Sequence, residues 1–271
     1  MLFQRTFFLI VFFSLLVQFE AQAQRTRRYH ADRYYFSDDE YSLKAIRRKP
    51  FQRFSVGFNY VPYSGTLKTQ AVDYDGTADT VQNHKLKGFG AGIAYTIMLP
   101  VARMGSKGLA SVYIGLNANY YMFNGDSVVI EVKRPNFTGR ETYSGLAGAA
   151  FMFGLPVGID FIGGAEASLQ KADRFSFSFG AGFFPMVAFG MVYQFPGINI
   201  MAPPYVKAEI GIHAGINWKL RATYIFRSPT SYSYSDDAMW TNYKGNLNVK
   251  LESNDQFMLS LLVQPFSWGW H

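Results

Sequence analysis

The feature that most constrains this chain is the strict alternation of apolar residues with small or polar residues that begins after Arg53. The clearest stretch is residues 111–122. One face there carries Val112, Ile114, Leu116, Ala118, Tyr120 and Met122, and the other carries Ser111, Tyr113, Gly115, Asn117, Asn119 and Tyr121. A period of two residues puts successive side chains on opposite faces of a strand. The pattern therefore predicts an all-β domain whose sheet has one apolar and one small or polar face.

Similar alternation recurs along the chain in segments 53–63, 88–99, 143–154, 157–170, 175–183, 205–226, 246–252 and 257–263. Many of these segments are longer than the ~5–6 residues of an average soluble strand and match the ~9–11 residues of a tilted membrane strand. Glycine, serine and asparagine on the second face suit a narrow lumen. An open sheet edge in lipid would leave backbone groups unpaired, so such a sheet must close. We expect an antiparallel transmembrane β-barrel of about ten strands, with eight or twelve as alternatives.

Composition points the same way, since aromatic residues make up 18% of the chain and charged residues 17%. Soluble domains carry about 25% charged residues, so part of this surface is expected to face lipid or a partner. Two alternatives remain, a helical inner-membrane protein and a soluble lipocalin-like barrel. The apolar stretches 146–165 and 175–195 are long enough for helices, but Pro156 and Gly180 are among the residues that interrupt them.

The N-terminus has the three regions of a secretory signal peptide. A basic start precedes the apolar run 7–17, and Ala21 and Ala23 are the small residues that a signal peptidase reads. The run is shorter than the ~20 residues needed to span a bilayer as a helix. We expect residues 1–23 to be a cleaved signal peptide, residues 24–52 a basic, tyrosine-rich periplasmic extension, and residues 53–271 the barrel.

Aromatic residues near the expected strand ends predict girdles at the two membrane interfaces. These residues are Tyr60, Tyr120, Trp218, Tyr224, Phe266, Trp268 and Trp270. Together with the signal peptide and the alternating strands, they resemble the small bacterial outer-membrane barrels of the OmpA/OmpX-like class, from Arg53 to the C-terminus. The resemblance implies a Gram-negative outer membrane, with its lipid as surroundings. It also implies that the last strand, 257–263, is recognised by the barrel insertion machinery, although this chain continues past Trp270 to His271.

The face expected to line the lumen carries charges of both signs, four acidic and four basic. With His213 they form a predicted polar network: Asp160, Glu166, Lys207, Glu209, His213, Lys219, Arg221, Lys250 and Glu252. Balanced charges in a low-dielectric interior tend to pair, whereas a selective pore more often shows a ring of one sign. The sequence therefore favours a plugged lumen.

The sequence does not indicate a catalytic, metal or cofactor site. The chain has no cysteine, which excludes disulfides, thiolate metal sites and cysteine nucleophiles. His213 and Glu209 lie roughly 13 Å apart along one strand, too far for a base and its orienting group. Segment 73–79 lacks the later glutamate of a calcium loop. We expect no catalytic residue, no metal and no cofactor.

Contact surfaces are expected in three long loops, 64–85, 124–142 and 227–244, and in the basic segment 25–53. Residues 253–255 are expected to form a tight turn. The basic residues do not share a helix face, so nucleic acid is not an expected partner. We expect a non-enzymatic structural or partner-binding protein of the cell envelope, with a periplasmic or cell-surface protein as partner. A small-solute porin or transporter is the alternative, and a lipid-modifying barrel enzyme is the second alternative.

Overall fold

The computed structural model describes residues 50–73, 81–105, 107–125, 128–134, 137–143, 146–169, 173–193, 195–226, 232–236, 245–253 and 255–270. The chain divides into two compact units, Met1–Ser42 and Leu43–His271, and every described residue belongs to the second. The expected signal peptide, 1–23, and nearly all of the expected extension, 24–52, lie outside the described residues. Among those described, no helix is long and apolar enough to cross a membrane.

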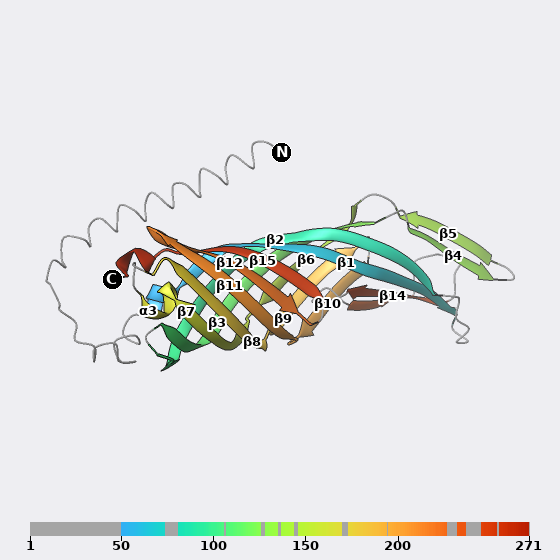
Figure 1. Ribbon diagram of the computed structural model, residues 1–271. Coiled ribbons are helices and arrows are strands. Elements are labelled where there is room, and N and C mark those ends of the chain that lie inside the picture. The colour runs from blue at the N-terminus through green and yellow to red at the C-terminus, as the bar shows by residue number, and fades with distance from the viewer. Residues whose placement is uncertain are drawn as a thin grey trace, which may run out of the picture. The chain divides into compact units, whose positions relative to one another are not determined.

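The described part of the chain is almost entirely antiparallel sheet (Figure 1). The strands are β1 (Ser55–Asp73), β2 (Gln82–Arg103), β3 (Gly108–Gly125), β4 (Val128–Arg134), β5 (Phe137–Tyr143), β6 (Leu146–Gly154), β7 (Val157–Gly164), β8 (Phe175–Phe183), β9 (Met186–Val192), β10 (Phe195–Met201), β11 (Pro204–Ala214), β12 (Ile216–Ile225), β13 (Tyr232–Asp236), β14 (Gly245–Ser253) and β15 (Gln256–Gln264). Three short helices accompany them, η3 (Pro50–Arg53), α3 (Ala165–Ser168) and η4 (Ser267–Gly269). Strands β4 and β5 form a separate hairpin.

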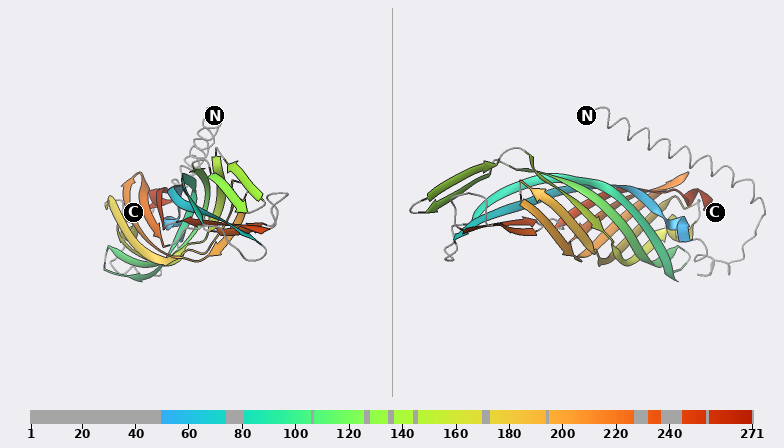
Figure 2. Two further views of the ribbon diagram at one scale, coloured as in Figure 1. Left: turned by 90° about the vertical axis from the view of Figure 1, so that its right-hand side faces the viewer. Right: turned by 180° about the vertical axis from the view of Figure 1, so that it is seen from behind.

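The sheet closes on itself. Strand β1 pairs with β2, β2 with β3, β3 with β7, β7 with β8, β8 with β11, β11 with β12, and β12 with β15. Strand β15 then pairs with β1, with Val56 opposite Val263, so the last strand meets the first. The views in Figure 2 show the strands wrapping around a common interior. The expected antiparallel barrel is confirmed.

Several strands of the wall are consecutive pieces of one line, interrupted at prolines. Strands β6 and β7 both pair with β3 and are separated at Pro156. Strands β9 and β8 are likewise separated at Pro185, and β10 and β11 at Pro203. Proline has no backbone N–H to give to a ladder, but each of these prolines still accepts a hydrogen bond of 2.8 Å from the neighbouring strand.

Strands β14 and β15 are also consecutive pieces of one line, because both pair antiparallel with β1. Strands β12 and β13 form another such line, because β12 pairs with β15 and β13 pairs with β14. The thirteen strands of the described sheet therefore lie along eight lines. Eight is the lower alternative of the expected strand number.

Two expected loops are wrong. Residues 253–255 do not turn the chain, because β14 and β15 follow one another along β1. Between Gly65 opposite Ser253 and Tyr60 opposite Leu259, β1 advances five residues and its partner six, so the irregularity is a bulge. Residues 64–85 are also mostly strand, since β1 runs to Asp73 and β2 starts at Gln82. Within 124–142 lies most of the β4–β5 hairpin. Within 227–244 only β13 is described.

We call the end of the barrel that carries η3, η4, α3 and the turns at Gly105 and Gly215 the terminal end, and the opposite end the loop end (Figure 1). At the loop end the described sheet has two edges, β10 and β13, which are not paired with each other. Pro203 and Pro204 lie between β10 and the first paired residue of the β11–β12 ladder, Tyr205. Proline has no backbone N–H to donate and is common at the edges of sheets.

The barrel is apolar outside and partly polar inside. On β3, exposed or half-buried apolar residues alternate with buried Ser111, Tyr113, Asn117 and Asn119, as expected from the sequence. The other strands likewise expose large apolar side chains, for example Phe177 at 54% and Ile210 at 62%. This distribution is the reverse of that in a soluble protein and is that of a barrel that lies in a bilayer. The structure is a transmembrane β-barrel.

Candidate functional site: the buried charge network

Six charged side chains of the described strands and of α3 are buried in the lumen near the terminal end. They come from β7 (Asp160), α3 (Glu166), β11 (Lys207 and Glu209) and β12 (Lys219 and Arg221). Each is at most 4% exposed. Lys207 and Glu209 are two residues apart, as are Lys219 and Arg221, so alternation puts the members of each pair on the same face of their strand. The hairpin register places Glu209 directly opposite Arg221.

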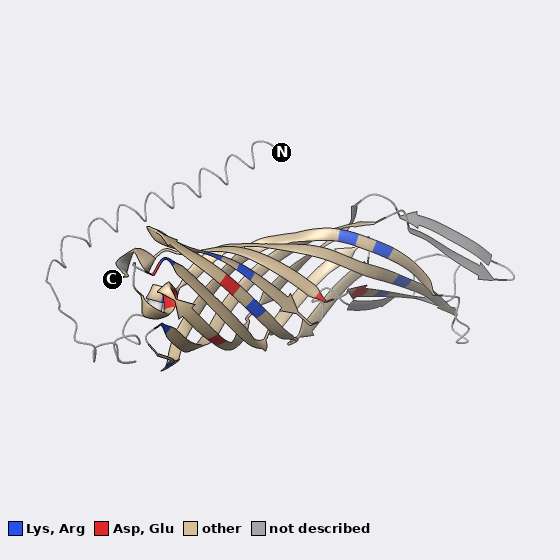
Figure 3. Ribbon diagram, in the orientation of Figure 1, with Lys and Arg blue, Asp and Glu red and all other residues tan. Residues whose placement is uncertain are grey.

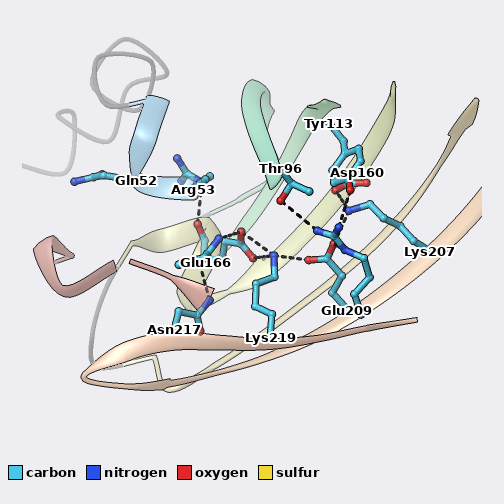
Figure 4. Close-up of polar contacts among 12 residues, drawn as sticks. Gln52, Arg53, Thr96, Tyr113, Asp160, Glu166, Lys207, Glu209, Asn217 and Lys219 are labelled. Carbon is cyan, nitrogen blue, oxygen red and sulfur yellow. Dashed lines mark hydrogen bonds and ion pairs between the residues drawn. The ribbon is translucent and has the colours of Figure 1, made fainter. Parts of the chain in front are cut away.

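Glu209 is the centre of the network (Figure 4). Its Oε1 accepts hydrogen bonds from Lys207 Nζ at 2.6 Å and from Arg221 Nε at 2.7 Å. Its Oε2 forms an ion pair with Lys219. One carboxylate thus contacts three cations, and the remaining positive charge is matched by carboxylates on either side.

Those carboxylates come from other elements of the wall. Lys207 Nζ lies 2.5 Å from Asp160 Oδ2, and Lys219 Nζ lies 2.9 Å from Glu166 Oε2. Gly180 makes room for Asp160, because a Cβ at position 180 would overlap the Asp160 carboxylate. The result is a continuous chain of opposite charges from Asp160 to Glu166.

The network also reaches the opposite wall. Arg221 Nη1 donates to the Tyr113 hydroxyl at 2.7 Å, and Nη2 donates to Thr96 Oγ1 at 3.3 Å. Lys207 Nζ lies 3.7 Å from the centre of the Tyr113 ring, a cation–π contact. Tyr113 belongs to β3 and Thr96 to β2, so the polar contacts cross the lumen from one side to the other.

At the terminal end the chain itself closes the lumen. The strand expected over 157–170 stops at Gly164, whose φ of 76° turns the chain into α3, and Glu166 is buried on this short helix. Arg53 Nε donates to the Glu166 carbonyl oxygen at 3.1 Å. Gln264 Nε2 donates to Glu166 Oε1 at 2.5 Å. The beginning and end of the barrel are therefore both tied to the helix that blocks the opening.

A second tie holds the turns of this end. Lys107 Nζ lies 2.7 Å from Asp173 Oδ1, and Ser168 Oγ donates to Asp173 Oδ2 at 3.0 Å. The hydrogen bond from Lys107 lowers the pKa of the half-buried Asp173 carboxyl.

Two further layers fill the lumen toward the loop end. In the first, Asn59 Nδ2 donates to Asn119 Oδ1 at 2.9 Å, and Ser260 Oγ donates to Asn59 Oδ1 at 2.7 Å. In the second, buried apolar side chains pack together, among them Tyr121, Phe123 and Leu251. A cavity of about 10 Å³ beside Tyr113, Tyr205, Lys207 and Thr223 has room for roughly one water molecule. The described side chains of these layers are buried.

Two of the residues expected in the network, Lys250 and Glu252, lie outside it. Val249 and Leu251 point inward, and the side chains of Lys250 and Glu252 are 62% and 39% exposed. The expectation was wrong for two reasons. The bulge before β15 reverses which residues face inward, and the interior is apolar at this end of the barrel, so alternation alone favoured the wrong face.

His213 and Trp270 are placed together at the terminal end, away from the charge network. Their rings stack with centres 5.3 Å apart. Trp270 is buried, and its Nε1 donates to the Gln52 carbonyl oxygen at 3.3 Å. Its expected place in an aromatic girdle is wrong, because η4 folds the chain back against the barrel. Trp268 is half-buried, and the other expected girdle residues are exposed on the outer surface: Tyr60, Tyr120, Trp218, Tyr224 and Phe266.

Sequence reasoning missed Arg53, Thr96, Tyr113 and Gln264 as members of the network. Thr96, Tyr113 and Gln264 lie on the inward faces of their strands, and Arg53 lies on η3. Alternation indicates which face of a strand a residue shares, but it does not indicate which residues of other strands it contacts. Among the described residues, no group of histidine and acidic side chains could hold a metal ion.

No family model matches the chain, and no curated protein matches it. Solved structures similar to this one include the outer membrane protein OprG from Pseudomonas aeruginosa, at 8% identity over 78% of this chain and 93% of that chain, with a TM-score of 0.45. They also include the outer membrane protease OmpT from Escherichia coli, at 6% identity over 78% and 95%, with a TM-score of 0.38. Neisserial surface protein A follows at 10% identity over 78% and 96%, with a TM-score of 0.31. The barrel assignment rests on the strand pairing and the apolar outer surface described above.

Proposed function

We propose that the protein is a non-enzymatic integral outer-membrane barrel with a sealed lumen, acting as a structural or partner-binding component of the cell envelope. The observation that carries this proposal is the charge network around Glu209, which ties β2, β3, β7, α3, β11 and β12 together across the lumen. A conducting pore needs a continuous path for water, and paired, buried charges occupy that path.

The connections support an orientation. Outer-membrane barrels have short periplasmic turns and longer extracellular loops. The terminal end has the short turns at Gly105 and Gly215, and the first and last described elements, η3 and η4, lie there. We therefore place the terminal end in the periplasm, reached after export by the signal peptide 1–23. The loop end, with the long connections and the β4–β5 hairpin, would face outward and offer the surface for a partner.

A planar bilayer experiment tests the sealed lumen. We expect purified full-length protein to give no steady conductance, while the same preparation shows the heat-dependent gel shift of a folded barrel. A porin added afterwards to the same membrane serves as the positive control. Steady conductance from the folded protein would contradict the proposal and favour the small-solute porin. A modified lipid product that disappears in His213→Ala would instead favour the lipid-modifying enzyme.

A further inference from the structure

At the loop end, the charges on the outer surface of the barrel gather on one wall (Figure 3). Lys68 on β1, Lys85 and Lys87 on β2, and Lys250 on β14 point outward, because the residues beside them in sequence, such as Leu67, Leu86 and Val249, are buried. We call these four lysines, with Glu252 of β14, the lysine patch. The wall at the other side of the loop end, formed by β6, β9 and β10, has no charged residue at all.

Strand register brings the patch together. Lys68 is directly opposite Lys250 on β14. Thr66, two residues earlier on β1, lies between Glu252 on β14 and Lys85 on β2. Adjacent strands are about 4.8 Å apart, so the patch spans three strands over a width of about 10 Å.

The patch carries more positive than negative charge. Glu252 bridges Lys68 at 2.6 Å and Lys250 at 2.9 Å. Lys85 and Lys87 stand opposite Thr66 and Ser64, which have no charge to offer.

Asp255 follows Glu252 by three residues and accepts a hydrogen bond of 2.6 Å from the Tyr224 hydroxyl. Even with Asp255 counted, lysines outnumber carboxylates by two. Lys85 and Lys87 lie two residues apart on the same outward face of β2, so their like charges repel, and an anion bound between them would reduce that repulsion.

The position along the barrel indicates which anion. On the outward face of β2, the apolar residues Ile93 and Phe89 are exposed, and Lys87 follows two residues further along. Two residues of strand cover about 7 Å, or less when the strand is tilted. The headgroup layer of a bilayer is roughly 5–7 Å thick on each side of the hydrocarbon core. If Phe89 lies in the hydrocarbon, Lys87 lies at the level of the headgroups.

We propose that the lysine patch binds the phosphate groups of anionic lipid headgroups in the leaflet around the loop end. The inference rests on the proposed membrane placement of the barrel. Lysine ammonium groups bind phosphate as compact point charges, and the apolar surface below the patch is where the acyl chains of the same lipid would pack. A lipid therefore fits the surface better than free phosphate, which would gain nothing from the apolar wall.

The test uses the full-length barrel in micelles of an uncharged maltoside detergent, titrated with short-chain phosphatidic acid and followed by native mass spectrometry. The wild type is compared with the Lys68→Gln, Lys85→Gln, Lys87→Gln triple variant. The matched control is Lys107→Gln, an exposed lysine of the terminal end that also pairs with a carboxylate. We expect the triple variant to bind phosphatidic acid about fivefold more weakly for each lysine removed, and the control to bind like the wild type.

Short-chain phosphatidylcholine and inorganic phosphate complete the experiment. Phosphatidylcholine is expected to bind weakly and equally to all three proteins, and inorganic phosphate to compete only at far higher concentration than the anionic lipid. Equal binding of phosphatidic acid to wild type and triple variant would overturn the proposal, as would competition by inorganic phosphate at the concentration of the lipid.

A heat-dependent gel shift shows that each variant is folded, and the single variant Lys87→Gln replaces the triple one if it does not fold. The lipid-binding experiment does not measure conductance. A negative result would therefore overturn the lipid proposal alone, and the planar bilayer experiment would still test the sealed lumen.

Discussion

Glu209 connects the buried charges of the lumen, because its one carboxylate contacts three cations. Lys207 and Arg221 bind one oxygen and Lys219 pairs with the other. The neighbouring carboxylates Asp160 and Glu166 each match only one of those cations. Removing one partner of a buried ion pair leaves an uncompensated charge in a low-dielectric interior, which costs more than the pair itself contributes.

At the residue scale we therefore expect Glu209→Gln to lower the free energy of unfolding by about 3–5 kcal/mol. Urea unfolding in micelles, followed by tryptophan fluorescence, measures the change. Glu252→Gln is the matched control, since Glu252 is also flanked by two lysines but is exposed on the outer surface. The control should change stability little, because exposed pairs are screened by solvent. Equal losses in the two variants would mean that the network does not stabilise the barrel.

At the scale of the element, the last line of the wall shows how one extra residue changes which side chains face the lumen. Val249 and Leu251 face inward on β14, whereas Gln256 and Met258 face inward on β15. Odd-numbered positions thus give way to even-numbered ones across the bulge at 253–255. Because strand alternation has a period of two, a single inserted residue exchanges the two faces.

Single cysteines test this exchange cleanly, because the chain has no cysteine of its own. We expect Lys250→Cys to react with a water-soluble maleimide in the folded barrel and Val249→Cys to stay unreacted until the protein is unfolded. The reason is that position 250 lies on the outer surface and position 249 in the packed interior. Labelling of Val249→Cys but not of Lys250→Cys in the folded barrel would contradict the bulge. It would show that Lys250 faces the lumen, as expected from the sequence.

At the scale of the whole molecule, the barrel exists because its first and last strands meet. Phe58 of β1 is directly opposite Leu261 of β15, although some two hundred residues separate them in the chain. Closure satisfies the backbone groups of both strands, which in lipid would otherwise cost several kcal/mol each. The same closure lets η3 at one end of the domain and Gln264 at the other reach Glu166 together.

We expect a Phe58→Cys, Leu261→Cys double variant to form a disulfide under mild oxidation, because residues directly opposite in antiparallel strands lie within the Cα separation that a disulfide needs. A cross-linked barrel migrates differently from the reduced one on a denaturing gel. Phe58→Cys with Phe257→Cys is the control, since position 257 lies four residues before Leu261 in β15. Cross-linking of the control pair alone would show that the strands meet in another register.

Much of this architecture was determined by the sequence itself, and the rest only by the tertiary structure. Alternation is a local property, so it placed Asp160, Lys207, Glu209, Lys219 and Arg221 on inward faces without knowledge of their neighbours. Register, strand number and closure depend on pairing between distant segments, and local patterns do not encode them. The position of Lys250, the burial of Trp270 and the convergence of three cations on Glu209 were therefore decided by the folded chain. An apolar interior at the loop end added to this, since there a hydrophobic residue no longer indicates the lipid-facing side.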